Sequence, residues 1–262
     1  MHSVLGLHSK AWPWKFKITD MKNVVRVDFS SRSMGAEIMD DLDCHGEVVD
    51  QTLRELDFIN QWLGGNNVTL QAIESIWKTI PKEQPLHIAD LGCGSGEMLR
   101  ILSRLAAKEN RNVTLTGFDA NPHIVDYAKN HSKKFNNIDF QSVSVFSQEF
   151  KDQKFDIVLA TLFMHHFTDS ELVALFSGLK QQTKSIILND IHRHSLAYHS
   201  IRLLTNLFSQ SAMVKFDAPL SVLRAFSKAE LNDILYKAGI TEFSLKWKWA
   251  FRWQLIIHGH QV

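Results

Sequence analysis

Cysteine is scarce in this sequence, because Cys44 and Cys93 are the only two among 262 residues. Two cysteines form at most one disulfide, which excludes the disulfide-rich scaffold of a small secreted protein. A reducing, cytoplasmic setting is therefore the simplest expectation.

Long apolar runs and an excess of one charge are missing too. No stretch approaches the roughly 20 apolar residues that a membrane helix needs, and the N-terminus lacks the pattern of a signal peptide. The net charge is only +1, without a long run of one sign, so a nucleic-acid partner is not indicated. With 45% hydrophobic residues, the chain can bury the core of one soluble α/β domain with an appendage.

Three alternate glycines mark the centre of the sequence. The apolar run 86–91 ends at Gly92, Gly94 and Gly96, and a helical stripe of apolar residues follows at once. Strand, glycine turn and helix are the parts of a nucleotide-binding loop, where a ligand approaches the backbone closely. The third glycine of the NAD fingerprint would fall at position 97, where this chain has Glu97. This difference argues against an NAD oxidoreductase.

A second strand pattern, 113–119, ends in Asp119, which is followed by Ala120-Asn121-Pro122. An acid at the tip of this strand can accept two hydrogen bonds from a ribose diol. The alternative is an acid that only caps the turn that follows it.

Together these two motifs resemble those of class I methyltransferases, which use S-adenosylmethionine. The resemblance implies that the glycine turn lies against the methionine part of the cofactor, that Asp90 helps to hold its ammonium group, and that Asp119 binds the ribose. Ser144 stands where many relatives have an acid for the adenine, so that contact departs from the family pattern. The expected cofactor residues are Asp90, Gly92, Cys93, Gly94, Gly96, Asp119, Ala120, Ser144 and Thr161.

The implied fold is a Rossmann-like, mostly parallel seven-stranded sheet with helices on both faces. Residues 1–84 are expected to form an N-terminal arm and helical cap, and residues 85–262 the methyltransferase core, with a helical lid inserted at 192–226. The patterns predict strands at 86–91, 113–119, 138–145, 155–160, 185–190, 241–247 and 251–258. They predict helices from 47 to a Gly64-Gly65-Asn66-Asn67 turn, and over 70–80, 98–105, 122–134, 168–180 and 227–238, with a further one in the lid.

Two histidines follow the fourth strand, at the sheet edge that also carries the glycine turn. This loop resembles the His-Asp-Trp loop of plant phenol O-methyltransferases, with His165 matching their catalytic base and His166 and Phe167 replacing Asp and Trp. A neutral imidazole can take the proton of a phenol during in-line methyl transfer. The alternative is a pair of histidines that only closes the loop by hydrogen bonding to the backbone.

The end of the fifth strand offers further polar candidates. His192, Arg193 and Tyr198 are expected to contact the substrate, with a helix cap as the alternative for His194 and Ser195. No metal is expected at the His-x-His pair of residues 192 and 194, because carboxylate partners are not evident. The apolar residues of the lid suggest an aromatic or lipid-tailed acceptor, and core packing or a homodimer contact are the alternatives.

The N-terminal arm interleaves basic and aromatic residues over 10–26, as in a nucleic-acid or membrane-surface strip, although a solvated arm with core-packed tryptophans is favoured. The stretches 37–41 and 60–65 are similar to bacterial methyltransferases that accompany polyketide synthases, which implies a phenolic or polyketide acceptor. We therefore expect small-molecule O-methylation. The remaining alternatives are a quinone-type C-methyltransferase and a non-catalytic protein that binds S-adenosylmethionine.

Overall fold

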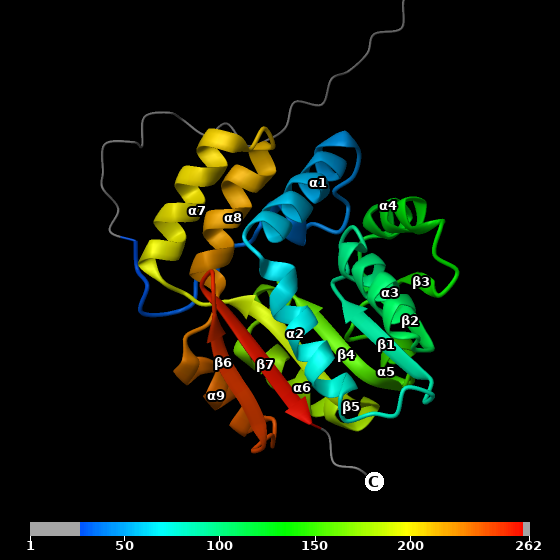
Figure 1. The fold of residues 1–262 in the computed structure, drawn as a ribbon. Helices are drawn as coiled ribbons and strands as arrows, with labels where there is room; N and C mark the ends of the chain where they lie inside the picture. Colours follow the sequence, from blue (N-terminus) through cyan, green and yellow to red (C-terminus); the bar gives the residue numbers. More distant parts are fainter. Residues whose placement is uncertain (1–26, 259–262) are drawn as a thin grey trace, which may run out of the picture.

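A computed structural model describes residues 27–258 of the chain, so the basic and aromatic stretch 10–26 lies outside the described residues. Within them, a central sheet is covered by helices on both faces (Figure 1). Its seven strands are β1 (Leu86–Leu91), β2 (Val113–Asp119), β3 (Ile138–Ser142), β4 (Phe155–Thr161), β5 (Thr183–Ile191), β6 (Phe243–Lys248) and β7 (Arg252–His258).

The strand order is β3-β2-β1-β4-β5-β7-β6, and β7 alone runs antiparallel to its neighbours. The central strands β1, β4 and β5 are buried along most of their length, as expected for parallel strands covered on both faces. The mostly parallel, seven-stranded sheet predicted from the sequence is confirmed.

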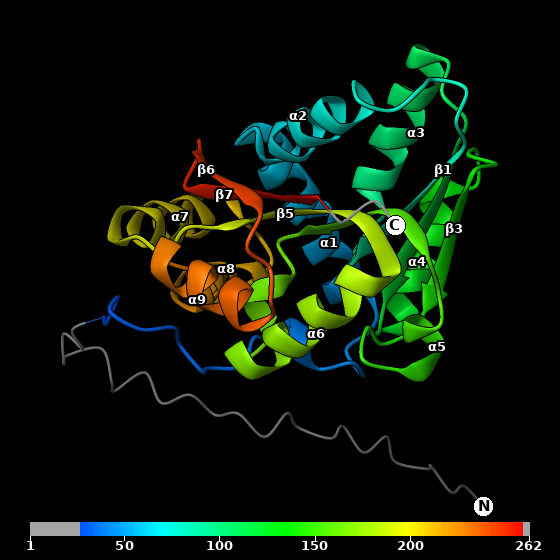
Figure 2. The same ribbon diagram turned by 90° about the horizontal axis from the view of Figure 1, so that it is seen from below.

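Helices pack on both faces of this sheet (Figure 2). One apolar core joins the sheet to α5, α6 and α9, and the other joins it to α2, α3 and α4. The α-helices are α1 (Glu47–Trp62), α2 (Gly65–Trp77), α3 (Glu97–Glu109), α4 (Pro122–Ser132), α5 (Gln148–Lys151), α6 (Asp169–Gln182), α7 (Ser195–Phe208), α8 (Ala212–Arg224) and α9 (Lys228–Lys237). Two short 3₁₀ turns also matter for the site, namely η2 (Ile38–Asp40) and η3 (Met164–His166).

Three helices gather beyond the carboxyl ends of the parallel strands. Helices α7 and α8 follow β5 and pack against each other, and α8 also packs against α1 (Figure 1). The region that the sequence presents as one broad apolar segment is two helices, because Ser209 ends α7 and Ser211 caps α8. Glu55 of α1 accepts hydrogen bonds from the backbone N–H groups of Gln210 and Ser211, which anchors this break to the N-terminal helices.

Several boundaries differ from the sequence patterns. Helix α2 begins at Gly65, because Leu63 and the left-handed residue Gly64 complete the turn after α1. Strand β3 ends at Ser142, three residues earlier than expected, and the next residues form a loop at the sheet edge. Helix α6 passes directly into β5 without a turn, because the buried Gln182 side chain donates to the carbonyl of Phe150.

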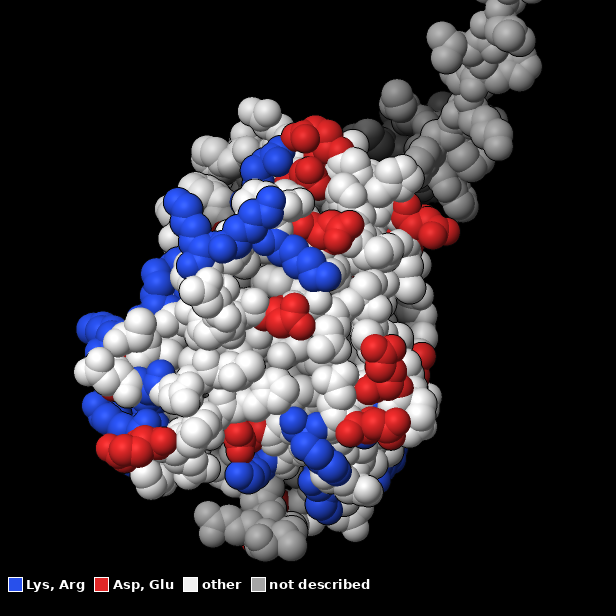
Figure 3. Space-filling model, turned by 90° about the vertical axis from the view of Figure 1, so that its right-hand side faces the viewer, with Lys and Arg blue, Asp and Glu red and all other residues white. Residues whose placement is uncertain are grey.

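Charge is mixed on the face that α3, α4 and β3 border. Both basic and acidic side chains lie on this face (Figure 3). No helix of the described residues is both long and apolar enough to cross a membrane.

Candidate active site

The glycine turn lies at the carboxyl end of β1. Gly92, Gly94 and Gly96 have φ angles of +63°, +51° and +76°, which side chains with a Cβ rarely adopt. A Cβ on Gly92 would lie 2.1 Å from the ring of Phe163, and one on Gly96 would lie 2.6 Å from the ring of Phe140. The nearest atom to a Cβ on Gly94 is 3.8 Å away, so the backbone there is open to a ligand.

Two carboxyl groups flank this turn. Asp90 is 2% exposed and its Oδ1 atom has no hydrogen-bond partner among the described residues. Burial, together with the nearby Asp119, raises the pKa of Asp90 to about 7. Asp119 ends β2 and accepts hydrogen bonds from the N–H groups of Asn121 (3.0 Å) and Gly94 (3.3 Å). An unpaired buried carboxyl and a second, anchored one fit a ligand that carries an ammonium group and hydroxyl groups.

A cavity of about 980 Å³ lies at this edge of the sheet. It runs from the glycine turn to the surfaces of α1, α7 and α8. Of the residues predicted from the sequence, these line it: Asp90, Gly92, Cys93, Gly94, Asp119, Ala120, Ser144, Thr161, His165 and His166. Gly96 is not part of the lining and instead serves as the N-cap residue of α3.

His165 is held in a single orientation by a carboxylate from β5. Its Nδ1 lies 2.7 Å from Oδ1 of Asp190, and its backbone N–H donates to the other oxygen of the same carboxylate (3.2 Å). Burial alone would raise the pKa of Asp190, but the interaction with His165 lowers it. The imidazole therefore presents Nε2 as its remaining nitrogen.

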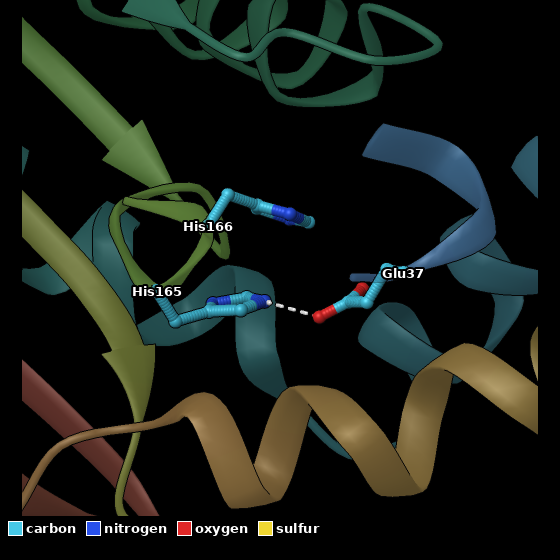
Figure 4. A group of neighbouring side chains, drawn as sticks. All are labelled: Glu37, His165 and His166. Atoms are coloured by element: carbon cyan, nitrogen blue, oxygen red, sulfur yellow. Dashed lines mark ion pairs between the residues drawn. The ribbon is translucent and has the colours of Figure 1, made fainter. Parts of the chain in front are cut away.

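Nε2 of His165 faces Glu37, which also lines the cavity. The distance to Oε1 of Glu37 is 3.7 Å, and both atoms are buried without a hydrogen-bond partner among the described residues (Figure 4). Burial raises the pKa of Glu37 to about 7. Its other oxygen accepts a hydrogen bond from the Ser221 hydroxyl (2.9 Å).

His166 has a carboxylate partner of its own. Its Nδ1 lies 2.6 Å from Oδ1 of Asp40, and the two imidazole centroids of His165 and His166 are 4.4 Å apart. Burial opposes ionisation of Asp40, but hydrogen bonds from His166 and Arg224 hold its pKa well below the usual range. Arg224 also donates to the backbone carbonyls of both histidines, so α8 fixes the histidine loop.

Sequence patterns single out the histidines but miss their partners. Asp40 ends η2 and Glu37 is its N-cap residue, and both are separated from the histidines by more than a hundred residues, so no local spacing reveals the pairs. The sequence does indicate that Asp190 lies near His165, because Asp190 lies near the end of a strand at the same sheet edge.

The three expected substrate residues do not line the cavity. The guanidinium of Arg193 donates to both carboxylate oxygens of Glu230 (2.7 and 2.9 Å) and to the carbonyl of Ala225. Tyr198 packs edge-on against Phe29, and His192 packs against Trp253. Direct substrate contacts from these side chains find no support in this arrangement.

Comparison with known proteins agrees with this geometry. The family model described as "Methyltransferase domain" matches residues 82–239. No curated protein matches the sequence.

Solved structures share the fold. The plantazolicin methyltransferase BpumL in complex with S-adenosylhomocysteine is 16% identical, with a TM-score of 0.59 over 81% of this chain and 95% of that chain. The magnesium protoporphyrin IX methyltransferase from Synechocystis, also with bound S-adenosylhomocysteine, is 17% identical, with a TM-score of 0.51 over 75% and 83%. The methyltransferase domain of the citrinin polyketide synthase is 15% identical, with a TM-score of 0.57 over 74% and 52%. The chain belongs to the family of methyltransferases that take their methyl group from S-adenosylmethionine.

Proposed function

We propose that this methyltransferase transfers the methyl group to the hydroxyl of a small acceptor with an aromatic or polyketide-derived apolar body. The observation that carries this proposal is the single cavity that joins the glycine turn to the histidine cluster and to apolar side chains of α7 and α8. Among the latter are Leu196, Ile201 and Leu204, which offer an acceptor an apolar wall.

S-adenosylmethionine, when bound, supplies an electrophilic methyl group. Asp90 would pair with its ammonium group, the backbone at Gly92–Gly94 would hold its methionine part, and Asp119 would accept the ribose hydroxyls. Ala120, Ser144 and Thr161 complete the proposed cofactor site. The unpaired Oδ1 of buried Asp90 supports this assignment, because such an atom favours a cationic partner.

Removing the ribose acid tests this placement. We expect Asp119→Ala to weaken S-adenosylhomocysteine binding by about 1.5 to 3 kcal/mol, because a charge-assisted contact with two hydroxyls is lost. Calorimetric titration measures this change, and Asp126→Ala on the exposed side of α4 is a matched control. Unchanged affinity in Asp119→Ala would refute the ribose assignment.

The buried acid at the end of β1 predicts a pH dependence of cofactor binding. The pKa of Asp90 in the free protein is about 7, and a bound ammonium group would lower it, since it favours the carboxylate. Affinity should therefore fall by roughly tenfold per pH unit below pH 7, with a proton released on binding. Calorimetry in buffers of different ionisation enthalpy measures both effects, which should disappear in Asp90→Asn.

The hydroxyl would lose its proton at the cluster of Glu37, His165 and His166. The sequence suggests His165 as the proton acceptor, and the hydrogen bond to Asp190 supports this by fixing the imidazole. Asp190 is then a positioning residue. Helices α7 and α8, at 195–224, would form the lid over the acceptor, with residues 27–84 as the cap on the other side of the cavity.

Matched acceptors test the atom that is methylated. We expect an alkylphenol to be methylated and the O-methyl ether of the same alkylphenol to be inert, because the ether offers only ring carbons. Products are identified by nuclear magnetic resonance. Methylation of the ether on a ring carbon would instead support a C-methyltransferase.

Partners and setting follow the same proposal. The acceptor is a small molecule and not a nucleic acid or a membrane, and the protein works in the cytoplasm, in line with the free thiols of Cys44 and Cys93. A homodimer contact through α7 remains a prediction, and the exposed Leu203, Leu207 and Phe208 offer an apolar surface for it.

A further inference from the structure

Two buried polar atoms in the histidine cluster face each other without contact. Oε1 of Glu37 and Nε2 of His165 are 3.7 Å apart, which is too far for a hydrogen bond. Their side chains are only 4% and 2% exposed, and neither atom has a hydrogen-bond partner among the described residues. Unsatisfied buried polar atoms are costly, so this pair points to an occupant between them.

The arrangement of donor atoms fits a metal ion. One ligand atom from each of Glu37, His165 and His166 lies within 4.8 Å of the other two (Figure 4). Around a tetrahedral zinc ion, with bonds of about 2.1 Å, neighbouring ligand atoms are about 3.4 Å apart, so the triad has to close by up to about 1.4 Å. Two imidazoles and one carboxylate are a known ligand set of catalytic zinc sites, and they leave a position open for water or substrate.

Both histidines already have the second partner that metal-binding histidines usually have. Asp190 accepts from Nδ1 of His165 at 2.7 Å, and Asp40 accepts from Nδ1 of His166 at 2.6 Å. A carboxylate on one ring nitrogen fixes the tautomer and turns the other nitrogen toward the ion. Nε2 of each imidazole is thus the nitrogen left for coordination.

The charge around the cluster also favours a cation. Five carboxyl groups interact electrostatically with His166, namely Glu37, Asp40, Asp119, Asp190 and Asp217. The guanidinium of Arg224 interacts with Glu37 and Asp40, and that of Arg252 with Asp190. Carboxyl groups therefore outnumber these guanidinium groups, and a divalent cation would offset part of the difference.

We propose that Glu37, His165 and His166 bind a divalent first-row transition-metal ion such as Zn²⁺, whose open position takes the oxygen of the acceptor. Nitrogen ligands select against Mg²⁺ and Ca²⁺. A hydroxyl acceptor that replaces a metal-bound hydroxide forms a bound oxyanion and releases one water, so the proton leaves with that water. His165 is then a metal ligand and not a free base. This proposal differs from both sequence expectations, namely that His165 is the catalytic base and that the protein binds no metal. The part of the ion in methyl transfer rests on the proposed function, whereas its binding does not.

Metal titration of the full chain tests this site without any acceptor. The chelator-treated protein is titrated with Zn²⁺ and Mg²⁺ by calorimetry, and with Co²⁺ by its visible absorption. We expect each chain to bind one Zn²⁺ ion at the triad and to show no comparable binding of Mg²⁺. The Zn²⁺ affinity of His165→Ala and Glu37→Gln should be at least about 100-fold lower than that of the parent. Asp190→Asn, which replaces the carboxylate partner of His165 but removes no ligand atom, should weaken binding by about 10- to 100-fold.

A control and two readouts make the outcome decisive. His123→Ala removes a histidine that pairs with Asp50 at 2.7 Å but does not line the cavity, and it should bind Zn²⁺ as the parent does. Glu37→Gln preserves side-chain shape, and its S-adenosylhomocysteine affinity reports whether it folds. The site would be overturned if the parent protein bound no Zn²⁺ at the triad. It would also be overturned if the Glu37 and His165 variants bound Zn²⁺ with the affinity of the parent. Methyl transfer at the full rate by metal-free protein would show that the ion takes no part in the reaction, and it would leave the proposed function intact. Binding of Zn²⁺ at the triad without methyl transfer to any hydroxyl would support the metal site and refute the proposed acceptor class.

Discussion

His165→Ala is expected to lower turnover by about 10²- to 10⁴-fold while S-adenosylhomocysteine binds as before. The imidazole is fixed by Asp190 at 2.7 Å and lies beside Glu37, so under the proposed function its removal takes away the group at which the hydroxyl would lose its proton. The loss follows whether His165 accepts the proton or holds a metal ion. Steady-state rates with an identified acceptor measure the change in turnover, and calorimetry measures the cofactor affinity.

His123→Ala is the matched control for this prediction. Like His165, His123 pairs with a carboxylate at 2.7 Å, but it does not line the cavity. Its turnover should equal that of the parent protein. A parental rate in His165→Ala would show that this loop only closes the fold.

Arg193→Ala is expected to lower the free energy of unfolding by about 3 kcal/mol and to leave cofactor affinity unchanged. The Arg193 side chain is 2% exposed and forms a bidentate pair with Glu230, and removing one member of a buried pair costs about 3 to 5 kcal/mol. The lower end applies because the Glu230 side chain is 24% exposed and remains partly hydrated. Thermal unfolding should show a midpoint about 6 to 12 °C lower.

Arg202→Ala provides the comparison, since Arg202 is exposed on α7, the helix that begins just after Arg193. It should change stability by less than about 0.5 kcal/mol. If Arg193→Ala were as stable as Arg202→Ala but bound acceptor poorly, the substrate contact expected from the sequence would be correct after all.

Local signals explain why the glycine turn was predictable. The spacing of Gly92, Gly94 and Gly96 after an apolar strand encodes the turn directly, because each needs a left-handed backbone. The parallel direction of the first five strands follows from the regular alternation of strand and helix. Asp119 was accessible to the same reasoning, since it ends the neighbouring strand.

Long-range pairs explain what the sequence did not reveal. His165 of η3 lies close to Glu37, the N-cap residue of η2, although the two are far apart in the sequence, and local patterns of charge and polarity do not predict such a pair. Arg193 shows the converse case, because a cation near the end of β5 suggests a ligand contact, whereas in the structure its guanidinium pairs with Glu230 of α9. The break between α7 and α8 is similarly hidden, since the apolar pattern continues on both sides of it.

A single-turnover experiment tests the central claim, that the protein transfers a methyl group to the hydroxyl of an acceptor bound in the cavity. Protein saturated with methyl-labelled S-adenosylmethionine is mixed with alkylphenols and alkylresorcinols, and both products are followed by chromatography and mass spectrometry. The account predicts that S-adenosylhomocysteine and an O-methylated phenol appear in equal amounts. Tight binding of the cofactor with no S-adenosylhomocysteine formed from any acceptor would contradict it and favour a non-catalytic binding protein.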